Sequence, residues 1–261
     1  MNKIEKEMLA ILRQGKEEFG YLGVKSEFEA EGTRVDEFLR LLEITRRADL
    51  NVGLKIGGCE AIRDLYEAQQ FGVDYIIAPM IETPYALRKY IEAVERTYGT
   101  EGIFETDFLF NIETITAFNN LDELTSLAGQ SKVKPGVVFG RVDFSLSNDF
   151  GRAKINTDEV QDYVCTVAQK CKDQDLNLVV GGGVSNEAIP GLKKIKAIRL
   201  DRFETRKIIF NAAQLSEKNI EKSLLAAVHF EILWLQNKQD YYTAISNEDD
   251  ARIKMLKSRW M

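Results

Sequence analysis

The sequence predicts an α/β fold, a (β/α)8 barrel of the TIM type, on three observations. The chain has 261 residues, of which 44% are hydrophobic, and this size fits one large barrel core better than two small domains. Short apolar runs rich in β-branched and aromatic residues alternate with longer segments of helical period, as in a parallel sheet with crossover helices. Charged residues and glycines follow these runs, where the active face of a barrel lies.

The strands are predicted in chain order from these apolar runs, and a helix is predicted after each one. The predicted strands are Tyr21 to Glu27, Asn51 to Ile56, Tyr75 to Pro79, Phe108 to Ile112, Gly136 to Phe139, Leu176 to Gly181 and Ala197 to Leu200. The predicted helices are Arg34 to Ala48, Glu60 to Phe71, Pro84 to Tyr98, Ile115 to Ala128, Thr157 to Lys172, Asn186 to Lys194 and Arg206 to Asn211.

Local signals support these helices and extend the helical pattern to the end of the chain. Pro84 stands where a first helical turn tolerates proline, and Thr157 with Asp158 supplies an N-cap and a first-turn acid. From Ser216 onward the sequence is helical and carries more apolar surface than an isolated tail. We expect residues 1–215 to form the catalytic barrel and residues 216–261 a helical extension, in the same domain or at the interface of a homo-oligomer.

Composition excludes several classes of partner. The net charge of −6 comes from acidic and basic residues mixed along the chain, which argues against binding to nucleic acid or to an anionic membrane. No apolar run approaches the roughly 20 residues of a membrane span, and the start of the chain is charged and amphipathic, unlike a signal peptide. We therefore expect a cytoplasmic protein whose three cysteines, which lack metal-ligand spacing, are reduced thiols.

One internal repeat joins two neighbouring predicted strand-to-helix turns. The segments Met80 to Leu87 and Asn111 to Phe118 share the pattern I-E-T-x-x-A, followed by an apolar residue. A glutamate beside a threonine suits any such turn, so the pattern has a purely structural interpretation. The alternative is that two adjacent units set Glu82 and Glu113 on the same rim of the barrel, near a substrate.

The carboxylates after the fourth and fifth predicted strands are the candidate metal ligands. Glu113 follows one strand and Asp143 the next, and the carboxyl ends of parallel strands meet on one face of a barrel. Mg²⁺ and Mn²⁺ take oxygen ligands and keep several waters, so two carboxylates suffice when substrate oxygens complete the shell. A helix cap at Glu113 and a turn at Asp143 are the structural alternatives.

Three motifs resemble one enzyme family. The sequences F-N-I-E-T-x-x-A-F-x-N-L-D-E-L and V-V-F-G-R-V-D-F-S-L-S-x-D-F-G, with G-V-D-Y-I-I-A-P-M-I-E-T-P-Y-A-L before them, resemble the HpcH/HpaI aldolase and citrate lyase β-subunit family. The resemblance covers roughly residues 50 to 155. It implies a metal-dependent carbon–carbon lyase that acts through a pyruvate-like or acyl-thioester enolate, with Mg²⁺ or Mn²⁺ held by Glu113 and Asp143.

The chain departs from this family at the substrate and base positions. Lys55 stands where the family has an arginine that holds the 2-keto acid, and a lysine offers a point charge in place of a bidentate fork. The family's histidine base is missing, and the single histidine, His229, is expected to be structural. Glu29 or Glu31, in a segment similar to citrate lyase β-subunits, is the candidate base; a solvated acidic loop is the alternative.

Further departures concern the strand ends. Gly140 and Arg141 shortly precede the predicted metal ligand Asp143, and Arg141 stands where the family commonly has proline. Arg141 is predicted to bind a substrate anion or to pair with the acidic loop. Gly181 to Gly183 is interpreted as a tight strand exit, and Arg202 or Arg206 as an anion contact or a surface ion pair. Relative to the family, the N-terminus is about one βα unit short, so the first helix and a neighbouring subunit supply this unit or the barrel is incomplete.

The sequence thus predicts a metal-dependent aldolase that acts on a small-molecule carboxylate. In this prediction Lys55, Arg141, Gly140 and Glu82 lie around the substrate, and Glu29, Glu31 and Lys55 carry the catalytic chemistry. The alternative prediction is a non-catalytic relative of the same fold that binds a small anion or a protein partner.

Overall fold

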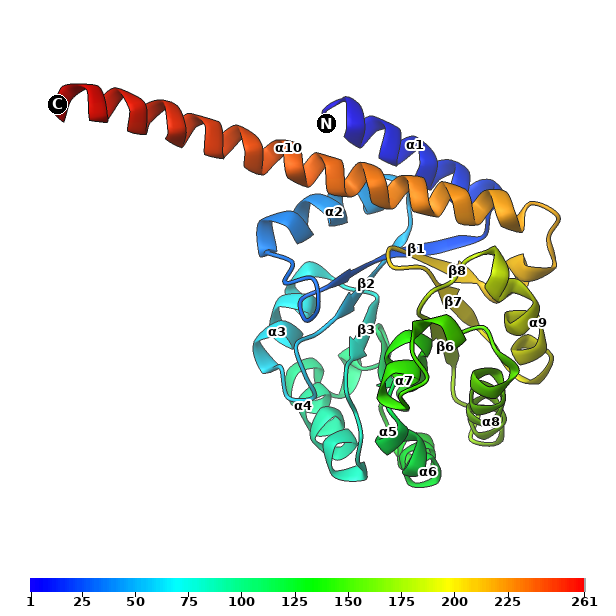
Figure 1. The fold of residues 1–261 in the computed structure, drawn as a ribbon. Helices are drawn as coiled ribbons and strands as arrows, with labels where there is room; N and C mark the ends of the chain where they lie inside the picture. Colours follow the sequence, from blue (N-terminus) through cyan, green and yellow to red (C-terminus); the bar gives the residue numbers. More distant parts are fainter. Residues whose placement is uncertain (261) are drawn as a thin grey trace.

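The computed structural model describes residues 1–260 and consists of a closed eight-stranded barrel surrounded by helices (Figure 1). The strands are β1 (Tyr21–Glu27), β2 (Asn51–Lys55), β3 (Tyr75–Ala78), β4 (Asp107–Ile112), β5 (Gly136–Gly140), β6 (Leu178–Gly181), β7 (Arg202–Glu204) and β8 (Ile208–Asn211). Neighbours from β1 to β7 pair in parallel, which confirms the predicted fold class.

The closure of the barrel differs from the regular (β/α)8 pattern. Strand β8 pairs antiparallel with both β7 and β1, so the last unit is a β-hairpin without a crossover helix. Thr205 closes the hairpin, because its amide donates to the Ile208 carbonyl at 3.0 Å. The barrel closes within the chain, so the two expectations of an incomplete barrel and of a unit supplied by a neighbouring subunit are both wrong; the irregular unit is the last one.

Two predictions near this hairpin are wrong. Ala197 and Ile198 end helix α9 (Ile189–Ile198), and the seventh strand starts at Arg202. The segment Arg206 to Asn211, predicted as a helix, contains β8. Its run Ile208, Ile209 and Phe210 has the residue types of a strand, but the charged residues before it resemble a helix surface. The segment forms a strand because it pairs with β1 and β7, and the local sequence alone does not determine this.

The remaining predicted helices are present with small shifts in their ends. The helices that follow strands β1 to β6 are α2 (Val35–Arg47), α3 (Ile62–Phe71), α4 (Pro84–Gly102), α5 (Ile115–Asn119), α6 (Leu121–Gln130), α7 (Arg141–Ser147), α8 (Asp158–Asp173) and α9. Three short 3-10 helices are η1 (Arg152–Lys154), η2 (Asn186–Ala188) and η3 (Ala212–Ser216). The predicted helix from Ile115 to Ala128 is interrupted at Asn120, whose side chain donates to the Glu82 carbonyl at 2.8 Å.

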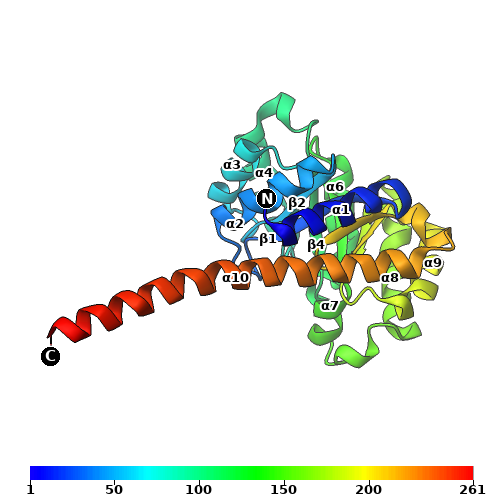
Figure 2. The same ribbon diagram turned by 90° about the horizontal axis from the view of Figure 1, so that it is seen from above.

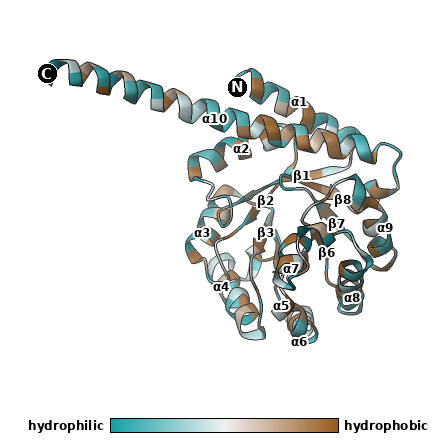
Figure 3. Ribbon diagram, viewed as in Figure 1, coloured by the Kyte–Doolittle hydropathy of each residue, from teal (hydrophilic) through white to brown (hydrophobic). Residues whose placement is uncertain are grey.

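The core has two parts, one outside and one inside the barrel. Most buried apolar residues of the strands and helices belong to one large cluster, which in this architecture lies between the strands and the surrounding helices. The ribbon coloured by hydropathy shows hydrophobic segments on both the strands and the helices (Figure 3). A small apolar cluster contains Tyr75, Ile77, Leu109, Val138, Val179 and Ile209. These residues alternate with the outer core along their strands, so they lie inside the barrel. The inward side chains that follow them towards the carboxyl ends of the strands are polar, and they form the candidate site.

Helices α1 (Lys3–Glu18) and α10 (Ile220–Trp260) pack side by side across one side of the barrel (Figure 2). Asn2 caps α1 in a capping box with Glu5, and its side chain donates to Asn237 of α10 at 2.7 Å. The first half of α10 is buried through Leu224, Ala227 and Trp234, whereas its second half projects from the body of the protein. In residues 1–260, no helix has the length and apolar character needed to cross a membrane.

The three cysteines are free in the structure, as the sequence predicts. Cys171, on helix α8, is fully buried, and burial raises the pKa of its thiol to about 12. A thiol with a raised pKa is a poor nucleophile, so Cys171 is a packing residue.

Candidate active site

Glu113 lies directly after β4, at the carboxyl end of the barrel strands, and only 3% of its surface is exposed. Its Oε1 accepts a hydrogen bond from the Met80 amide at 3.0 Å, and its Oε2 accepts one from the Asn111 side chain. A Cβ atom at Gly140, on the neighbouring strand β5, would lie 2.9 Å from the Cβ of Glu113. The glycine therefore provides the space that the Glu113 side chain occupies.

Asn111 is a site residue that sequence reasoning missed. It lies two positions after Leu109 and two before Glu113, so strand alternation points all three side chains to the inside of the barrel. Its Oδ1 is buried and has no hydrogen-bond partner in the described chain. A single asparagine in the apolar run F-L-F-N-I was the available signal, because such a residue needs a polar partner inside the barrel.

Asp143 lies in the first turn of α7, three residues beyond the end of β5, and its side chain is exposed. Its carboxylate therefore stands on the short helix that follows the strand and not on the strand itself. Within residues 1–260 no group of three or more histidine, cysteine, aspartate or glutamate side chains forms a metal site. The oxygens of Glu113, Asp143 and Asn111 nevertheless match a hard divalent cation, because such ions keep several waters and need few protein ligands.

Lys55, the last residue of β2, connects two of the predicted site residues. Its Nζ lies 3.4 Å from Oε2 of Glu113 and 3.4 Å from Oε2 of Glu29. The Lys55 side chain is buried, whereas Glu29 is about one-third exposed. The structure therefore brings Glu29, Lys55 and Glu113 into one cluster, in which the Lys55 ammonium lies between the two carboxylates.

Glu31 belongs to a different contact. Its carboxylate accepts from Arg206 at 3.1 Å and forms an ion pair with the buried Lys207, so it fastens the loop after β1 to the β7–β8 hairpin. Burial lowers the pKa of Lys207, and Glu31 offsets part of this effect. Strand β1 ends at Glu27, so Glu29 and Glu31 lie in the loop after the strand and need not point to the same side.

Lys25, Glu27 and Glu204 form a buried ionic group inside the barrel. Lys25 Nζ contacts Glu204 and lies 3.4 Å from Oε1 of Glu27. Burial alone would raise the pKa of Glu27, but Lys25, Lys55 and the hairpin cations outweigh it and lower the pKa. The cations interleaved with these carboxylates therefore decide the direction of the shift. Glu204 escaped sequence reasoning since its segment was not recognised as a strand.

Arg141 is almost fully buried and donates to backbone carbonyls. Its Nη2 donates to the Gly182 carbonyl at 2.8 Å and its Nη1 to the Asn156 side chain at 3.0 Å, while Nε lies 3.4 Å from the Gly181 carbonyl. Burial lowers the pKa of this guanidinium to about 10. Pairing of Arg141 with the acidic loop is not observed; the side chain instead holds the glycine turn against α7.

The turn of Gly181 to Gly183 is the tight strand exit that the sequence predicts. Gly182 and Gly183 have φ angles of 82° and 61°, and a Cβ at Gly182 would lie 2.8 Å from the Val142 amide nitrogen. A residue other than glycine would be strained there.

The other candidate residues occupy distinct places. Glu82 lies on the same rim as Glu113, because its Oε1 accepts from the Thr114 hydroxyl at 2.7 Å. Arg202 lies at the opposite end of the barrel, where it pairs with Asp107 at 2.9 Å, so its predicted contact with a substrate anion is wrong. His229 lies on α10, half-exposed and 3.6 Å from Glu7 of α1.

Comparison with known proteins gives this cluster a family context. The model of the HpcH/HpaI aldolase/citrate lyase family matches residues 30–188, more than half of the chain and the whole segment that carries Lys55, Glu113 and Asp143. The chain belongs to this family. Membership supports a lyase- or aldolase-type activity.

Solved structures of similar fold agree with this assignment. The HpcH/HpaI aldolase from Desulfitobacterium hafniense DCB-2 superposes with a TM-score of 0.61 and 14% identity, over 76% of this chain and 82% of that one. An HpcH/HpaI aldolase/citrate lyase family protein from Burkholderia cenocepacia J2315 superposes with a TM-score of 0.62 and 12% identity, over 90% of both chains. Citrate synthase SbnG gives 0.60 at 14% identity, over 89% and 90%. At these identities the likeness shows the fold.

A further similarity concerns part of a longer protein. The chain is 30% identical over 189 residues to UvrABC system protein C of Thermotoga sp. (strain RQ2) and of Thermotoga maritima. The match covers 67% of this chain but 33% of those proteins, so the chain spans about a third of the length of these curated relatives. A partial likeness of this kind assigns none of their activity to this family member.

Proposed function

We propose that this protein is a divalent-metal-dependent carbon–carbon lyase that acts on a 2-keto acid or related acyl substrate through a pyruvate-like enolate. The observation that carries the proposal is the buried Glu113 carboxylate at the carboxyl end of β4, beside the Lys55 ammonium and the unpartnered Oδ1 of Asn111. Family membership supports the reaction class.

The proposed ligands of the Mg²⁺ or Mn²⁺ ion are Glu113 and Asp143. Asn111 is close enough to Glu113 to add a carbonyl oxygen or to orient the carboxylate, since its amide already donates to Oε2. When bound, such an ion would stabilise the negative charge that develops on an enolate oxygen. Helix α7 carries Asp143 next to the start of α5, where the Ile115 amide donates to Ser147 at 3.0 Å.

Lys55 is proposed to bind the carboxylate of the substrate. Its ammonium is buried, is held by Glu29 and Glu113, and presents a single point charge in place of a guanidinium fork. Gly140 keeps the approach to Glu113 free of a side chain, and Glu82 fixes the neighbouring turn through Thr114. Arg141 is proposed to contact the substrate through the two guanidinium N–H groups that do not donate to Gly181, Gly182 or Asn156.

Glu29 is the preferred acid/base residue of the two candidates. It is partly exposed, sits beside Lys55 and has no hydrogen bond to backbone, so it can exchange a proton with a substrate hydroxyl. Glu31 is held by Arg206 and Lys207 and is proposed to support the loop.

The experiment that tests this function is calorimetric titration of the chelator-stripped protein with Mg²⁺ and Mn²⁺, with and without oxalate, which mimics a pyruvate enolate. Tight oxalate binding that requires the metal is the expected result. The Glu113→Gln and Asp143→Asn variants should lose this binding while they keep the circular dichroism spectrum of the barrel. Unchanged metal-dependent oxalate binding in either variant would contradict the ligand assignment.

The alternative is a non-catalytic relative that binds a small anion or a protein partner. The missing histidine base and the ion pair between Lys55 and Glu113 are the observations in its favour. Oxalate binding without any metal requirement, together with no release of pyruvate from 4-hydroxy-2-keto acids, is the outcome that supports this alternative.

A further inference from the structure

One face of α10 keeps its apolar character beyond the point where the helix leaves the barrel. The residues on this face follow each other at intervals of three or four: Trp234, Lys238, Tyr241, Ile245, Asp249, Arg252, Leu256 and Trp260. Trp234 is buried against the body of the protein, whereas Ile245, Leu256 and Trp260 are exposed. Trp260 has 91% of its surface accessible. A face that is buried in one half of a helix and apolar but uncovered in the other half indicates a second contact surface.

Nothing in the described part of the chain holds the projecting half. Tyr242 donates to Glu37 of α2, and beyond it no residue up to Trp260 makes a hydrogen bond or ion pair outside the helix. All residues from 243 to 260 are exposed. At about 1.5 Å per residue, this segment extends for about 27 Å, and an isolated helix of this length is only marginally stable in water. A partner for the segment is therefore expected.

The charges of the projecting half divide into two blocks. Residues 248–250 are all acidic, whereas residues 252–259 contain two arginines, two lysines and no acid. Two such helices placed side by side in the same direction would align like charges. When they run in opposite directions, Asp249 in the acidic block of each helix can face Arg252 at the start of the basic block of the other. The pattern is thus complementary to itself in the antiparallel orientation.

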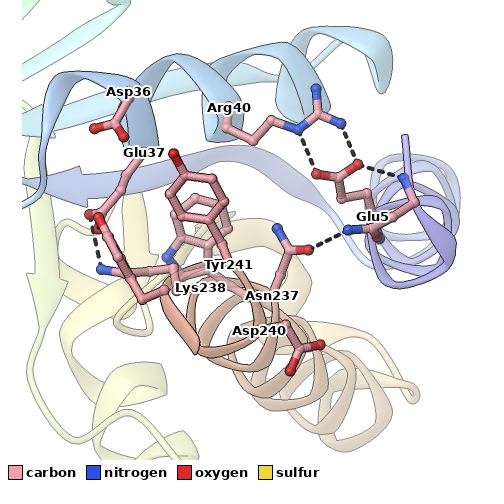
Figure 4. Close-up of a pocket in the computed structure, with 11 residues that line it drawn as sticks. Glu5, Asp36, Glu37, Arg40, Asn237, Lys238, Asp240 and Tyr241 are labelled. Carbon is pink, nitrogen blue, oxygen red and sulfur yellow. Dashed lines mark hydrogen bonds and ion pairs between the residues drawn. The ribbon is translucent and has the colours of Figure 1, made fainter. Parts of the chain in front are cut away.

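A cavity lies where α10 leaves the barrel, and its lining is acidic and aromatic (Figure 4). It has a volume of about 400 Å³ and lies between the N-terminal part of α1, helix α2 and the middle of α10. Its carboxylates are Glu5, Asp36, Glu37 and Asp240, and its cations are Arg40 and Lys238. Arg40 pairs with Glu5 and Lys238 with Glu37, so Asp36 and Asp240 remain to attract an external cation.

We propose that the projecting half of α10 pairs antiparallel with the same segment of a second copy of this chain, so that the basic C-terminal end of each copy covers the acidic cavity of the other. The register that matches best is centred between residues 250 and 251. It places Ile245 opposite Leu256, Asp249 opposite Arg252 and Tyr241 opposite Trp260 of the second copy. Apolar, ionic and aromatic pairs thus form on the same face, and the arrangement is a closed two-fold dimer. This inference is independent of the proposed catalytic function.

Disulfide cross-linking between two single variants tests both the partner and the orientation. In the proposed register, Ile245→Cys of one copy faces Leu256→Cys of the other, within the short distance that a disulfide requires. Two copies of the same variant would have their new cysteines 11 residues apart along the helix, about 16 Å. A mixture of the two variants should therefore give a covalent dimer under mild oxidation, whereas each variant alone should give little. Parallel pairing would give the opposite pattern, and that result would overturn the proposal.

The controls separate this contact from the native thiols and from other interfaces. Asn247→Cys and Ala251→Cys place thiols on the opposite face of the same helix and should not cross-link in a mixture. Equal cross-linking of this control pair would show random collisions and would contradict the register. Sedimentation velocity should show that Leu256→Glu weakens dimerisation at least tenfold, since it buries a charge, and that Ala251→Glu has little effect. A wild-type chain that stays monomeric at micromolar concentrations would also refute the dimer.

Discussion

Lys55 Nζ lies 3.4 Å from Oε2 of Glu113, the residue proposed to bind a divalent cation. An ammonium group beside a metal ligand would repel a cation bound to that ligand, so we expect Lys55 to affect the charge of the site as well as the substrate contact. In the arginine-containing members of the family pattern, a guanidinium would stand at this position. The exchange to lysine therefore bears on both metal affinity and substrate orientation.

Replacement of Lys55 should separate these two effects. Lys55→Met removes the positive charge beside Glu113, so Mn²⁺ alone should bind about tenfold tighter, whereas oxalate should bind the metal-loaded protein at least tenfold more weakly. Calorimetric titration measures both affinities in the same sample. The exposed Lys132 makes a matched control, because Lys132→Met changes the net charge by the same amount at a position far from the site. If Lys55→Met weakens metal binding, the ammonium acts as a support of Glu113 instead.

A methyl group at Gly140 should disturb the Glu113 carboxylate. The new Cβ of Gly140→Ala would lie 2.9 Å from the Glu113 Cβ and 3.0 Å from its Oε2, so the side chain must move. We expect a loss of metal-dependent oxalate binding of tenfold or more and a destabilisation of about 1–3 kcal/mol, as in other overpacked positions. Gly58→Ala is the control, because nothing lies within 4 Å of its Cβ. Equal behaviour of the two variants in the binding titration would argue against the position assigned to Glu113.

Glu29 and Glu31 should give opposite phenotypes. Glu29→Gln is expected to lower turnover by at least a hundredfold at unchanged thermal stability, because Glu29 is proposed to transfer a proton and is partly exposed. Glu31→Gln leaves the buried Lys207 without its nearest carboxylate, so we expect it to destabilise the fold by about 3–5 kcal/mol. Thermal denaturation and pyruvate release measure the two quantities. Loss of turnover in Glu31→Gln at full stability would reverse the assignment of the base.

Acidic pH should loosen α10 from the barrel. Hydrogen bonds from Arg40 lower the pKa of Glu5. Burial would raise the pKa of Glu37, but its bonds with Tyr242 and Lys238 outweigh this and lower it. A lowered carboxyl pKa in the folded state adds stability above the usual value of 4.5, and this contribution disappears as the pH falls through the folded-state pKa. The junction of α1, α2 and α10 should therefore weaken below pH 4.5.

Tryptophan fluorescence can follow this change at one position. The chain has two tryptophans, and Trp260→Phe leaves Trp234, which is buried in the junction. Its emission should shift to longer wavelengths on acidification. Glu37→Gln should show part of this shift already at neutral pH, whereas the exposed Glu123→Gln should not. An emission spectrum that stays constant until the whole barrel unfolds would refute a local opening.

The order of elements from β1 to β6 was predictable because each strand and its helix carry their own signal. The alternating apolar pattern places Leu109 and Asn111 on the same side of β4, and the N-caps Thr83 and Thr114 mark the helix starts through hydrogen bonds to Ala86 and Ala117. These features depend on residues close together in the chain. The β7–β8 hairpin was not predictable in this way, because Ile208 to Phe210 form a strand only by pairing with β1, far away in the sequence.

The features of the candidate site also fall into those that local sequence determines and those that depend on tertiary contacts. The sequence by itself determined the barrel, the rim on which Glu113 and Asp143 lie, and the family to which these motifs belong, because strand ends and short motifs are local properties. The tertiary structure alone decided that Lys55 lies between Glu29 and Glu113, that Glu31 belongs to the hairpin, that Arg141 holds the glycine turn, and that half of α10 stands free. Distances, burial and ion pairing between residues far apart in the chain depend on the closed barrel, and no local pattern encodes them.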